Sequence, residues 1–160
     1  MKKIRVAEPG DETAIHELIQ ALADYERAPD EVINTPEQLF IDLFEDNVCD
    51  AFVVESEEQK VVGFALYYTS YSTWKGRCLY LEDFYVLPEH RRGGIGSELF
   101  QRVVDVARER GICKNMQIAI VNCNFRYRGI SVAGVSVLVS DFVSVFLSSE
   151  SDVLLRLRGN

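Results

Sequence analysis

The chain has 160 residues, which suits one domain, because domains usually hold roughly 100–200 residues. Its hydrophobic fraction of 48% is enough for a buried core and excludes an intrinsically disordered chain. The 17 Lys and Arg residues against 25 Asp and Glu residues give a formal net charge of −8. This balance argues against a nucleic-acid partner, which needs a basic face, and favours a small cationic substrate, since a negative field concentrates cations.

The features that report on cellular location favour the cytoplasm. The basic residues at 1–5 are not followed by the apolar run of a signal peptide, and the apolar stretch 132–139 is too short to cross a bilayer. The four cysteines show no CxxC spacing, so we expect reduced thiols and no metal site. We therefore expect a cytoplasmic protein that has no membrane or nucleic-acid partner.

The first predicted elements are a strand and a helix. Residues 3–7 alternate as in a short strand, which the Pro-Gly pair at 9–10 ends. Asp11 is then expected to cap a helix. The apolar stripe of this helix has the i, i+3, i+4, i+7 spacing and comprises Ile15, Leu18, Ile19 and Leu22.

A second helix is expected to begin at residues 35–38. Thr35 and Gln38 form a Thr-x-x-Gln capping box, and Pro36 supplies a preset backbone angle at the first helical position. The buried face of this helix would comprise Leu39, Phe40, Leu43 and Phe44.

After residue 50 the pattern becomes extended. Two segments rich in Val, Phe and Tyr, 51–55 and 61–69, flank a polar turn and predict a hairpin. Residues 77–86 predict a third strand, which Pro88 ends.

The next part of the chain predicts a helix over 94–110, followed by Gly111 as a stop signal. The inward residues of this helix would be Leu99, Val103, Val106 and Ala107. A short strand is expected over 116–121, and the alternation over 133–147 predicts a strand or hairpin.

A glycine-rich turn, Arg-Arg-Gly-Gly-Ile-Gly at 91–96, joins the third strand of this region to the helix. Glycines let a ligand approach the backbone closely, and a helix N-terminus adds partial positive charge, so the turn predicts an anion site. Arg91 and Arg92 can add charge-assisted hydrogen bonds to a phosphate. The spacing fits neither a Walker loop nor a Rossmann fingerprint. The alternative interpretation is a glycine-rich turn with solvated arginines.

Two acidic clusters are candidate groups for proton transfer or cation binding. Glu82 and Asp83 lie late in the strand that feeds the turn, and strict alternation predicts that they face opposite sides. A carboxylate there could accept a proton from an ammonium substrate, or the pair could simply face solvent. The segment of Tyr25 and Glu26 could bind a cation or form an ordinary charged helix end.

These segments resemble the GNAT acyltransferase superfamily. The resemblance lies in the Arg91-x-x-Gly94-x-Gly96 turn and in residues 18–26, 61–68 and 79–84, which are similar to the diamine (spermidine/spermine) acetyltransferases. It covers about residues 4–116 and implies one acetyltransferase domain over 1–160. The implied fold is α/β, with a mixed, mainly antiparallel sheet flanked by helices. Acetyl-CoA would enter where two strands splay apart, and a homodimer is implied.

The resemblance also assigns roles to residues. The backbone of Phe84, Tyr85 and Val86 would pair with the pantetheine arm. The diphosphate would be held by Arg91, Arg92, Gly93, Gly94, Ile95, Gly96 and Ser97. The amine would be bound by Tyr25, Glu26, Glu82 and Asp83. Glu82 would accept the proton of the amine, which attacks the thioester directly without a covalent enzyme intermediate.

Residues 117–160 depart from the family. Aligned without gaps, Asn124 matches a cofactor-binding asparagine, but Cys123 and Ser131 replace the family's tryptophan and its catalytic tyrosine. A four-residue deletion would instead bring Tyr127 into the role of the acid that protonates the leaving thiolate. One hypothesis is that the reading frame slipped near residues 112–120, which sequencing the gene would decide.

The function that the resemblance implies is acetyl-CoA-dependent N-acetylation of a primary amine of a polyamine or a lysine-like small molecule. Two alternatives remain open. One is acetylation of a protein N-terminus or an amino-sugar, and the other is a catalytically impaired CoA-binding module.

Overall fold

The computed structural model describes residues 2–74, 76–112, 116–118 and 137–139, the last two segments by their backbone. Its described strands form one sheet in the order β1-β2-β3-β4-β5-β6. Their bounds are β1 Lys3–Val6, β2 Asp50–Glu55, β3 Val61–Ser72, β4 Gly76–Val86, β5 Met116–Ile118 and β6 Val137–Val139. The first four strands pair antiparallel, whereas β5 runs parallel to β4 and β6 parallel to β5. The predicted mixed, mainly antiparallel sheet is confirmed.

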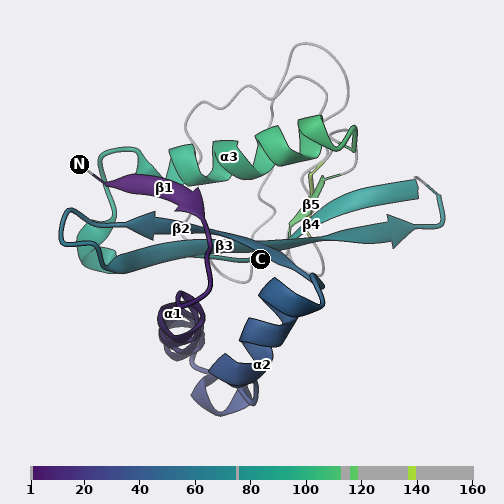
Figure 1. Cartoon of the computed structure of the whole chain (residues 1–160). Helices are drawn as coiled ribbons and strands as arrows, with labels where there is room; N and C mark the ends of the chain where they lie inside the picture. Colours follow the sequence, from purple (N-terminus) through teal and green to yellow (C-terminus); the bar gives the residue numbers. More distant parts are fainter. Residues whose placement is uncertain (1, 75, 113–115, 119–136, 140–160) are drawn as a thin grey trace, which may run out of the picture.

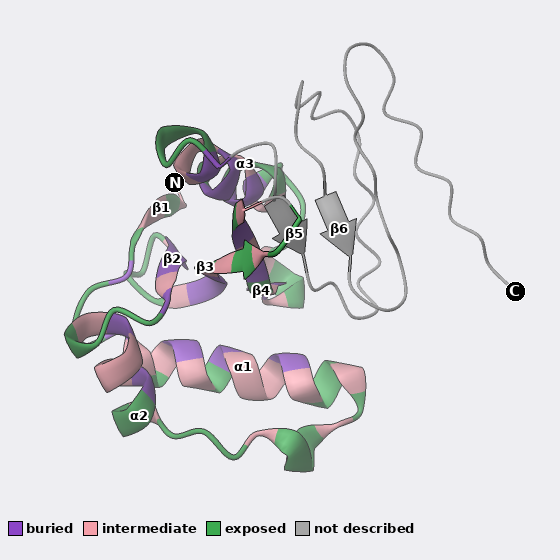
Figure 2. Cartoon of the chain, turned by 90° about the vertical axis from the view of Figure 1, so that its right-hand side faces the viewer, coloured by how far each residue is buried: buried purple, intermediate pink, exposed green. Residues whose placement is uncertain are grey.

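Helices cover both faces of this sheet (Figure 1). Helices α1 and α2 lie on one face and α3 lies on the other, as the turned view in Figure 2 also shows. Their bounds are α1 Glu12–Glu26, α2 Pro36–Phe40 and α3 Ile95–Glu109, with short helical turns η1 Pro29–Glu31, η2 Ile41–Glu45 and η3 Pro88–His90. Within the described ranges, no helix is both long and apolar enough to span a membrane.

Each face of the sheet has its own apolar core. The core on the α1 side contains the predicted stripe residues Ile15, Leu18 and Leu22, with Ile19 packed at its margin. The core on the α3 side contains Leu99, Val103 and Ala107, with Val106 at its margin. The helical spacings seen in the sequence therefore identified the buried faces of α1 and α3.

The second helix begins as expected and then changes its winding. The Thr35 hydroxyl accepts a 3.2 Å hydrogen bond from the backbone N–H of Gln38, which confirms the cap. The Gln38 amide does not complete the box, because it donates to Asp42 at 2.9 Å. After Phe40 the helix continues as a π-helical turn, and Leu39 and Leu43 are its buried residues.

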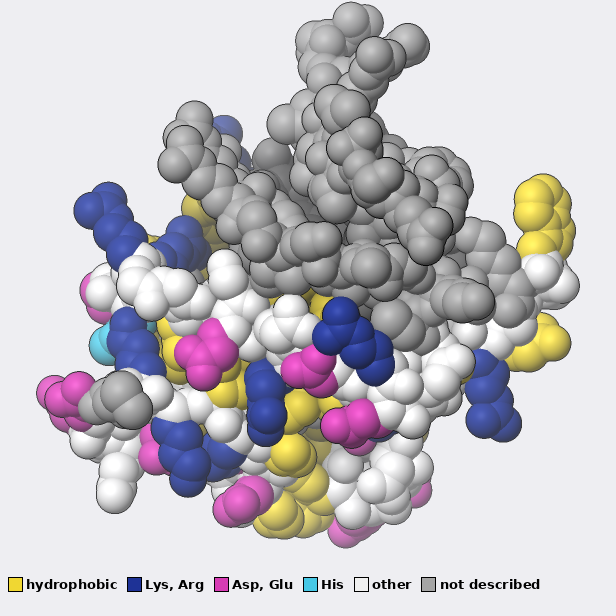
Figure 3. Space-filling view, turned by 90° about the horizontal axis from the view of Figure 1, so that it is seen from above, with side chains coloured by type: hydrophobic (Ala, Val, Ile, Leu, Met, Phe, Trp, Pro, Cys, Tyr) yellow, Lys and Arg dark blue, Asp and Glu magenta, His cyan; other side chains and the backbone are white. Residues whose placement is uncertain are grey.

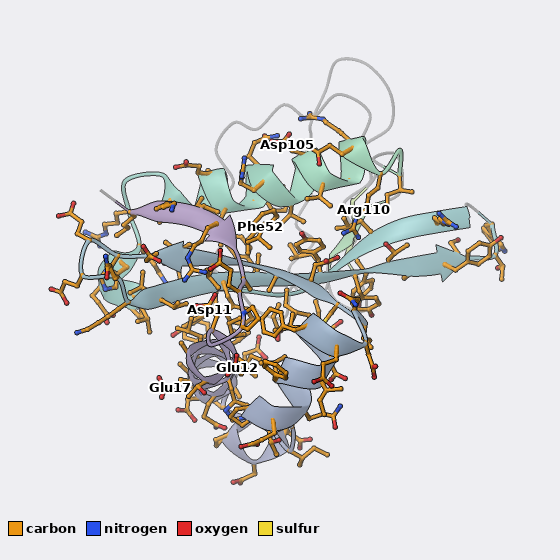
Figure 4. All side chains as sticks on the ribbon, in the orientation of Figure 1. Asp11, Glu12, Glu17, Phe52, Asp105 and Arg110 are labelled. Atoms are coloured by element: carbon orange, nitrogen blue, oxygen red, sulfur yellow. The ribbon has the colours of Figure 1, made fainter. Side chains whose placement is uncertain are left out.

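Asp11 does not cap α1 as predicted. Although it occupies the N-cap position, its side chain makes no capping hydrogen bond. Its carboxylate instead accepts two hydrogen bonds from Arg5, of 2.6 and 2.9 Å, and one of 2.8 Å from the Glu8 backbone N–H. Figure 4 shows Asp11 at the junction between β1 and α1. Asp11 binds Arg5 and does not cap the helix because a charged guanidinium forms a stronger hydrogen bond to a carboxylate than a backbone N–H does.

The remaining elements follow the sequence pattern where they are described. β2 and β3 form the expected hairpin, and β4 ends two residues before Pro88. The backbone of Gly111 has φ +68° just after α3, which suits a glycine stop. Only Met116–Ile118 and Val137–Val139 are described of the strands expected over 116–121 and 133–147.

Candidate active site

In the part of the chain that the structure describes, β4 has a strand neighbour on one side only beyond Leu81, and we call the other side its open edge. Among the described residues, β5 pairs with β4 from Leu79 to Leu81 and no further. β4 itself continues to Val86, paired with β3 on its other side. The backbone N–H of Leu87 donates a 3.0 Å hydrogen bond to the carbonyl of Val62 in β3. Because successive residues of a strand turn their backbone groups to opposite sides, the N–H and C=O of Val86 point away from β3, toward the open side. The family resemblance predicts that a pantetheine arm would pair along this edge.

A β-bulge places the acidic pair. β3 and β4 are in register as Leu66 with Asp83 and Tyr67 with Leu81, so Glu82 is an extra residue on β4. The alternation is interrupted at this residue, and Leu81 and Phe84, three positions apart, both pack with the α3-side core. The prediction that Glu82 and Asp83 face opposite sides is therefore wrong, because a bulge shifts the pleat by one residue.

Both carboxylates interact with groups on the α1 side. Glu82 is exposed, and its charge acts on the hydroxyl of Tyr68, a residue that packs against the α1-side core. Asp83 is half-buried, and burial, the charge of Glu82 and the charge of Glu26 raise its pKa to about 6. Burial also raises the pKa of Glu26 at the end of α1. The structure thus brings three predicted acidic residues to one place.

A pair of stacked tyrosines supports Glu82. The rings of Tyr68 and Tyr80 are direct cross-strand partners, and their centroids lie 5.2 Å apart. Burial, followed by the charge of Glu82, raises the pKa of Tyr68, so its hydroxyl keeps the proton that it can donate. Tyr68 was not among the predicted site residues, although its place in a Tyr-Tyr pair opposite the Tyr80-x-Glu82 segment is a visible signal.

The glycine-rich turn has the backbone shape of an anion site. Arg92, Gly93 and Gly94 have consecutive φ values of +79°, +80° and +87°. A Cβ at Gly93 or Gly94 would meet nothing within 4 Å, so the space above the turn is open and the glycines are required by their backbone angles. Ile95 is buried in the α3-side core and fixes the start of the 15-residue helix α3. Gly96 and Ser97 follow in its first turn.

Two further residues shape this region and were missed by the sequence analysis. A Cβ at Gly63 would lie 2.9 Å from the carbonyl oxygen of Tyr85 and 2.9 Å from Cγ2 of Val86, so β3 can approach the end of β4 only with glycine here. A glycine inside a strand is the signal that could have indicated it. Lys2 donates a 2.5 Å hydrogen bond from Nζ to the carbonyl of His90, which ties the N-terminal strand to the turn.

Arg91 is engaged within the protein. Its Nε donates a 2.7 Å hydrogen bond to the carbonyl of Val86, on the open edge of β4. Its guanidinium carbon lies 5.6 Å from the ring centroid of Tyr25 and 5.2 Å from that of Tyr85. Tyr25 and Tyr85 thus meet at Arg91, which the sequence analysis had placed with the diphosphate.

Some predicted site residues lie outside the description. Tyr127, the expected acid, and Asn124 are not among the described residues, nor are Cys123 and Ser131. Within the part of the chain that is described, no group of three or more His, Cys, Asp or Glu side chains could hold a metal ion. On the face seen from above, basic and acidic side chains are intermingled rather than gathered by sign (Figure 3).

A sheet whose fourth strand carries a bulge and an open edge, followed by a glycine-rich turn into a helix, defines an acyltransferase fold of the GNAT type. Residues 15–129 match the family model described as the Acetyltransferase (GNAT) family. The chain belongs to this family and is an N-acetyltransferase.

Individual relatives and a solved structure agree with this assignment. The chain is 43% identical over 131 residues to thialysine N-epsilon-acetyltransferase of Bos taurus, covering 77% of this chain and 76% of the relative. It is 39% identical over 112 residues to spermidine/spermine N(1)-acetyltransferase-like protein 1 of Homo sapiens, and the match covers 66% of this chain and 16% of that relative. The crystal structure of a predicted acetyltransferase with acetyl-CoA from Clostridium acetobutylicum has the same fold, with a TM-score of 0.59 at 17% sequence identity. The match covers 82% of this chain and 97% of that chain.

Proposed function

We propose that this chain transfers an acetyl group from acetyl-CoA to a primary amine of a polyamine or a lysine-like small molecule. The observation that carries the proposal is the bulge in β4, which brings Glu82 and Asp83 together near Glu26, beside the open strand edge. A cluster of carboxylates suits a substrate with one or more ammonium groups. The relatives named for thialysine and for spermidine/spermine support the same class of acceptor.

The described residues fit acetyl-CoA as the donor substrate. The open edge of β4 offers backbone groups for an extended amide-containing arm, and the turn at 91–97 offers an uncrowded backbone and a helix N-terminus for the diphosphate. The role proposed for Phe84, Tyr85 and Val86 is to form the strand edge along which that arm lies, with Phe84 and Val86 turning their backbone groups toward it. The role proposed for Arg91 to Ser97 is anion binding.

In the proposed mechanism, Glu82 accepts a proton from the bound ammonium, directly or through a water molecule. An alkylammonium of this kind has an ordinary pKa of about 10.4, so a base is needed to generate the neutral amine at pH 7. The amine nitrogen then forms a bond to the thioester carbonyl carbon, the carbon–sulfur bond breaks, and the nitrogen loses its second proton to solvent to give the neutral amide. Tyr127 is the proposed donor of a proton to the leaving thiolate. Alignment of the two substrates by the site supplies a further part of the rate.

The test is release of free thiol from acetyl-CoA in the presence of a panel of amines. The panel contains spermidine, lysine, thialysine, glucosamine and a peptide with a free N-terminus, each assayed with wild type and Glu82→Gln. We expect turnover with the diamine and lysine-like members, and a kcat lower by about 10²- to 10⁴-fold for the variant. Glu58→Gln, an exposed residue of the β2–β3 turn, is the matched control.

Other outcomes select the alternatives. Turnover with the peptide or glucosamine alone would change the acceptor class. Thermal stabilisation by CoA without thiol release would select a CoA-binding module. Equal turnover by wild type and Glu82→Gln would remove Glu82 from the mechanism. The proposed homodimer is checked by light scattering of the purified protein.

A further inference from the structure

Arg91 connects two parts of the candidate site that belong to different elements. It touches Tyr25, in the last turn of α1, and Tyr85, near the end of β4, with its guanidinium 5.6 and 5.2 Å from the two ring centroids. It also binds the carbonyl of Val86 at 2.7 Å. One side chain therefore bridges the helix end proposed to bind the amine and the strand edge proposed to bind acetyl-CoA.

The partners of Arg91 differ in how firmly they are held. Tyr85 is buried in the α1-side core, and Val86 is fixed in the sheet by pairing with Gly63. Tyr25 is 43% exposed and lies at the end of α1. Two contacts tie Arg91 to β4 and the third ties it to Tyr25, so the position of the guanidinium depends on Tyr25 as well as on the strand.

We infer that Arg91 is a positioning residue that couples the amine site to the cofactor edge through Tyr25. This inference rests on the proposed function. A ligand on either side of Arg91 then shares the ordering of the same Tyr25–Arg91–Tyr85 contact, so binding at one site favours binding at the other. Such coupling is reciprocal by thermodynamic necessity.

Coupled roles of Arg91 and Tyr25 can be distinguished from independent roles by the affinity for CoA. If Arg91 only held the diphosphate and Tyr25 only held the amine, replacing Tyr25 would not change the affinity for CoA in the absence of amine. Under the coupling described here, loss of the Tyr25 ring loosens Arg91 and weakens CoA binding. A guanidinium–aromatic contact of this kind is worth about two- to thirtyfold in an equilibrium constant, depending on its exposure.

The experiment is titration calorimetry of CoA, without amine, into four full-length proteins: wild type, Tyr25→Leu, Arg91→Gln and the double variant. We expect the dissociation constant of Tyr25→Leu to rise about three- to tenfold. We expect Tyr25→Leu to have no further effect in the Arg91→Gln background, because the contact is already lost. Tyr25→Phe, which keeps the ring, should bind CoA like wild type.

Controls separate the possible failures. Tyr71→Leu makes the same chemical change at a 75% exposed position in β3 and should leave CoA affinity unchanged. Unchanged CoA affinity in Tyr25→Leu would overturn the inference while leaving the proposed function intact. Additive effects in the double variant would also overturn it, since Tyr25 would then act independently of Arg91. Absence of CoA binding by wild type would overturn the proposed function and this inference with it.

Discussion

Tyr68 and Glu82 are neighbours across the bulge between β3 and β4, close enough that the charge of the carboxylate raises the pKa of the phenol. Tyr68 is held in turn by stacking on Tyr80 at 5.2 Å. The side chain proposed to act as the base is exposed and has a phenol hydroxyl beside it as a potential hydrogen-bond donor. Such support matters because a base works only when it lies within hydrogen-bond reach of the proton it accepts.

We predict that Tyr68→Phe lowers kcat about three- to thirtyfold, because the ring packing is kept while a hydroxyl that can donate to the Glu82 carboxylate is lost. The affinity for CoA should stay within about twofold of wild type, since Tyr68 lies away from the open edge of β4. Steady-state kinetics and CoA titration measure the two effects. Tyr71→Phe is the control. A kcat equal to that of wild type would show that Glu82 needs no such support.

We predict that Asp83→Asn stabilises the protein at pH 8. In the folded state the pKa of Asp83 is about 6, above its ordinary value of 3.8, so the wild type loses stability as the pH rises between these values. Above about pH 6 the loss is complete, and below about pH 4 it is absent. Allowing for solvent screening of a half-buried group, the variant should gain about 1–2 kcal/mol of unfolding free energy at pH 8.

Urea unfolding at pH 8 and pH 4 tests this, with the exposed Asp46→Asn as a control. The gain should be present at the higher pH and lost at the lower one. An equal gain in unfolding free energy at pH 8 and pH 4 would mean that a change in packing, and not the ionisation of Asp83, is responsible.

We predict that Gly63→Ala weakens CoA binding as well as stability. Its Cβ would crowd the Tyr85 carbonyl and the Val86 side chain at 2.9 Å, and relieving this contact displaces the end of β4. Overpacking of this kind costs about 1–3 kcal/mol. Gly10→Ala is the comparison, because it is strained by a φ of +108° but meets no atom within 4 Å. Chemical unfolding and CoA titration should show that both variants lose stability and only Gly63→Ala loses affinity.

We predict that Asp11→Asn destabilises the protein by about 1–3 kcal/mol near neutral pH. Asp11 is 8% exposed and bound by Arg5, which would retain only its 2.9 Å pair with Glu55. Burial opposes ionisation of Asp11, but hydrogen bonds from Arg5 and the Glu8 backbone lower its pKa below 3.8. The stabilisation is therefore present above about pH 4 and is lost as the pH falls further.

Urea unfolding at pH 7 and pH 3, again beside Asp46→Asn, measures this difference. A variant as stable as wild type at pH 7 would mean that the ion pair merely offsets its own cost of burial.

The sequence predicted those features that depend on neighbours along the chain. The stripe of Ile15, Leu18 and Leu22 identified the buried face of α1, and Thr35 was recognised as a cap because its partner lies three residues away. The Arg91-to-Ser97 turn was recognised for the same reason, since its glycines and the following helix are contiguous.

The features that were wrong or missed depend on contacts between different helices and strands. Asp11 was assigned to its own helix, because nothing local shows that Arg5 lies across from it. The bulge at Glu82 depends on how β3 pairs, and the position of Arg91 depends on Tyr25, 66 positions earlier in the numbering. Alternation and spacing describe one element at a time, so they cannot report contacts between elements.

The hairpin of β3 and β4 carries the bulge, both of its carboxylates and the open edge. Its strands are joined by a short connection, so the loop-closure entropy of forming it is small, whereas β1 can pair with β2 only after the chain has passed through α1 and α2. The framework on which catalysis depends is therefore among the easiest parts of the molecule to assemble. It should also persist in partly unfolded forms that have released the N-terminal strand.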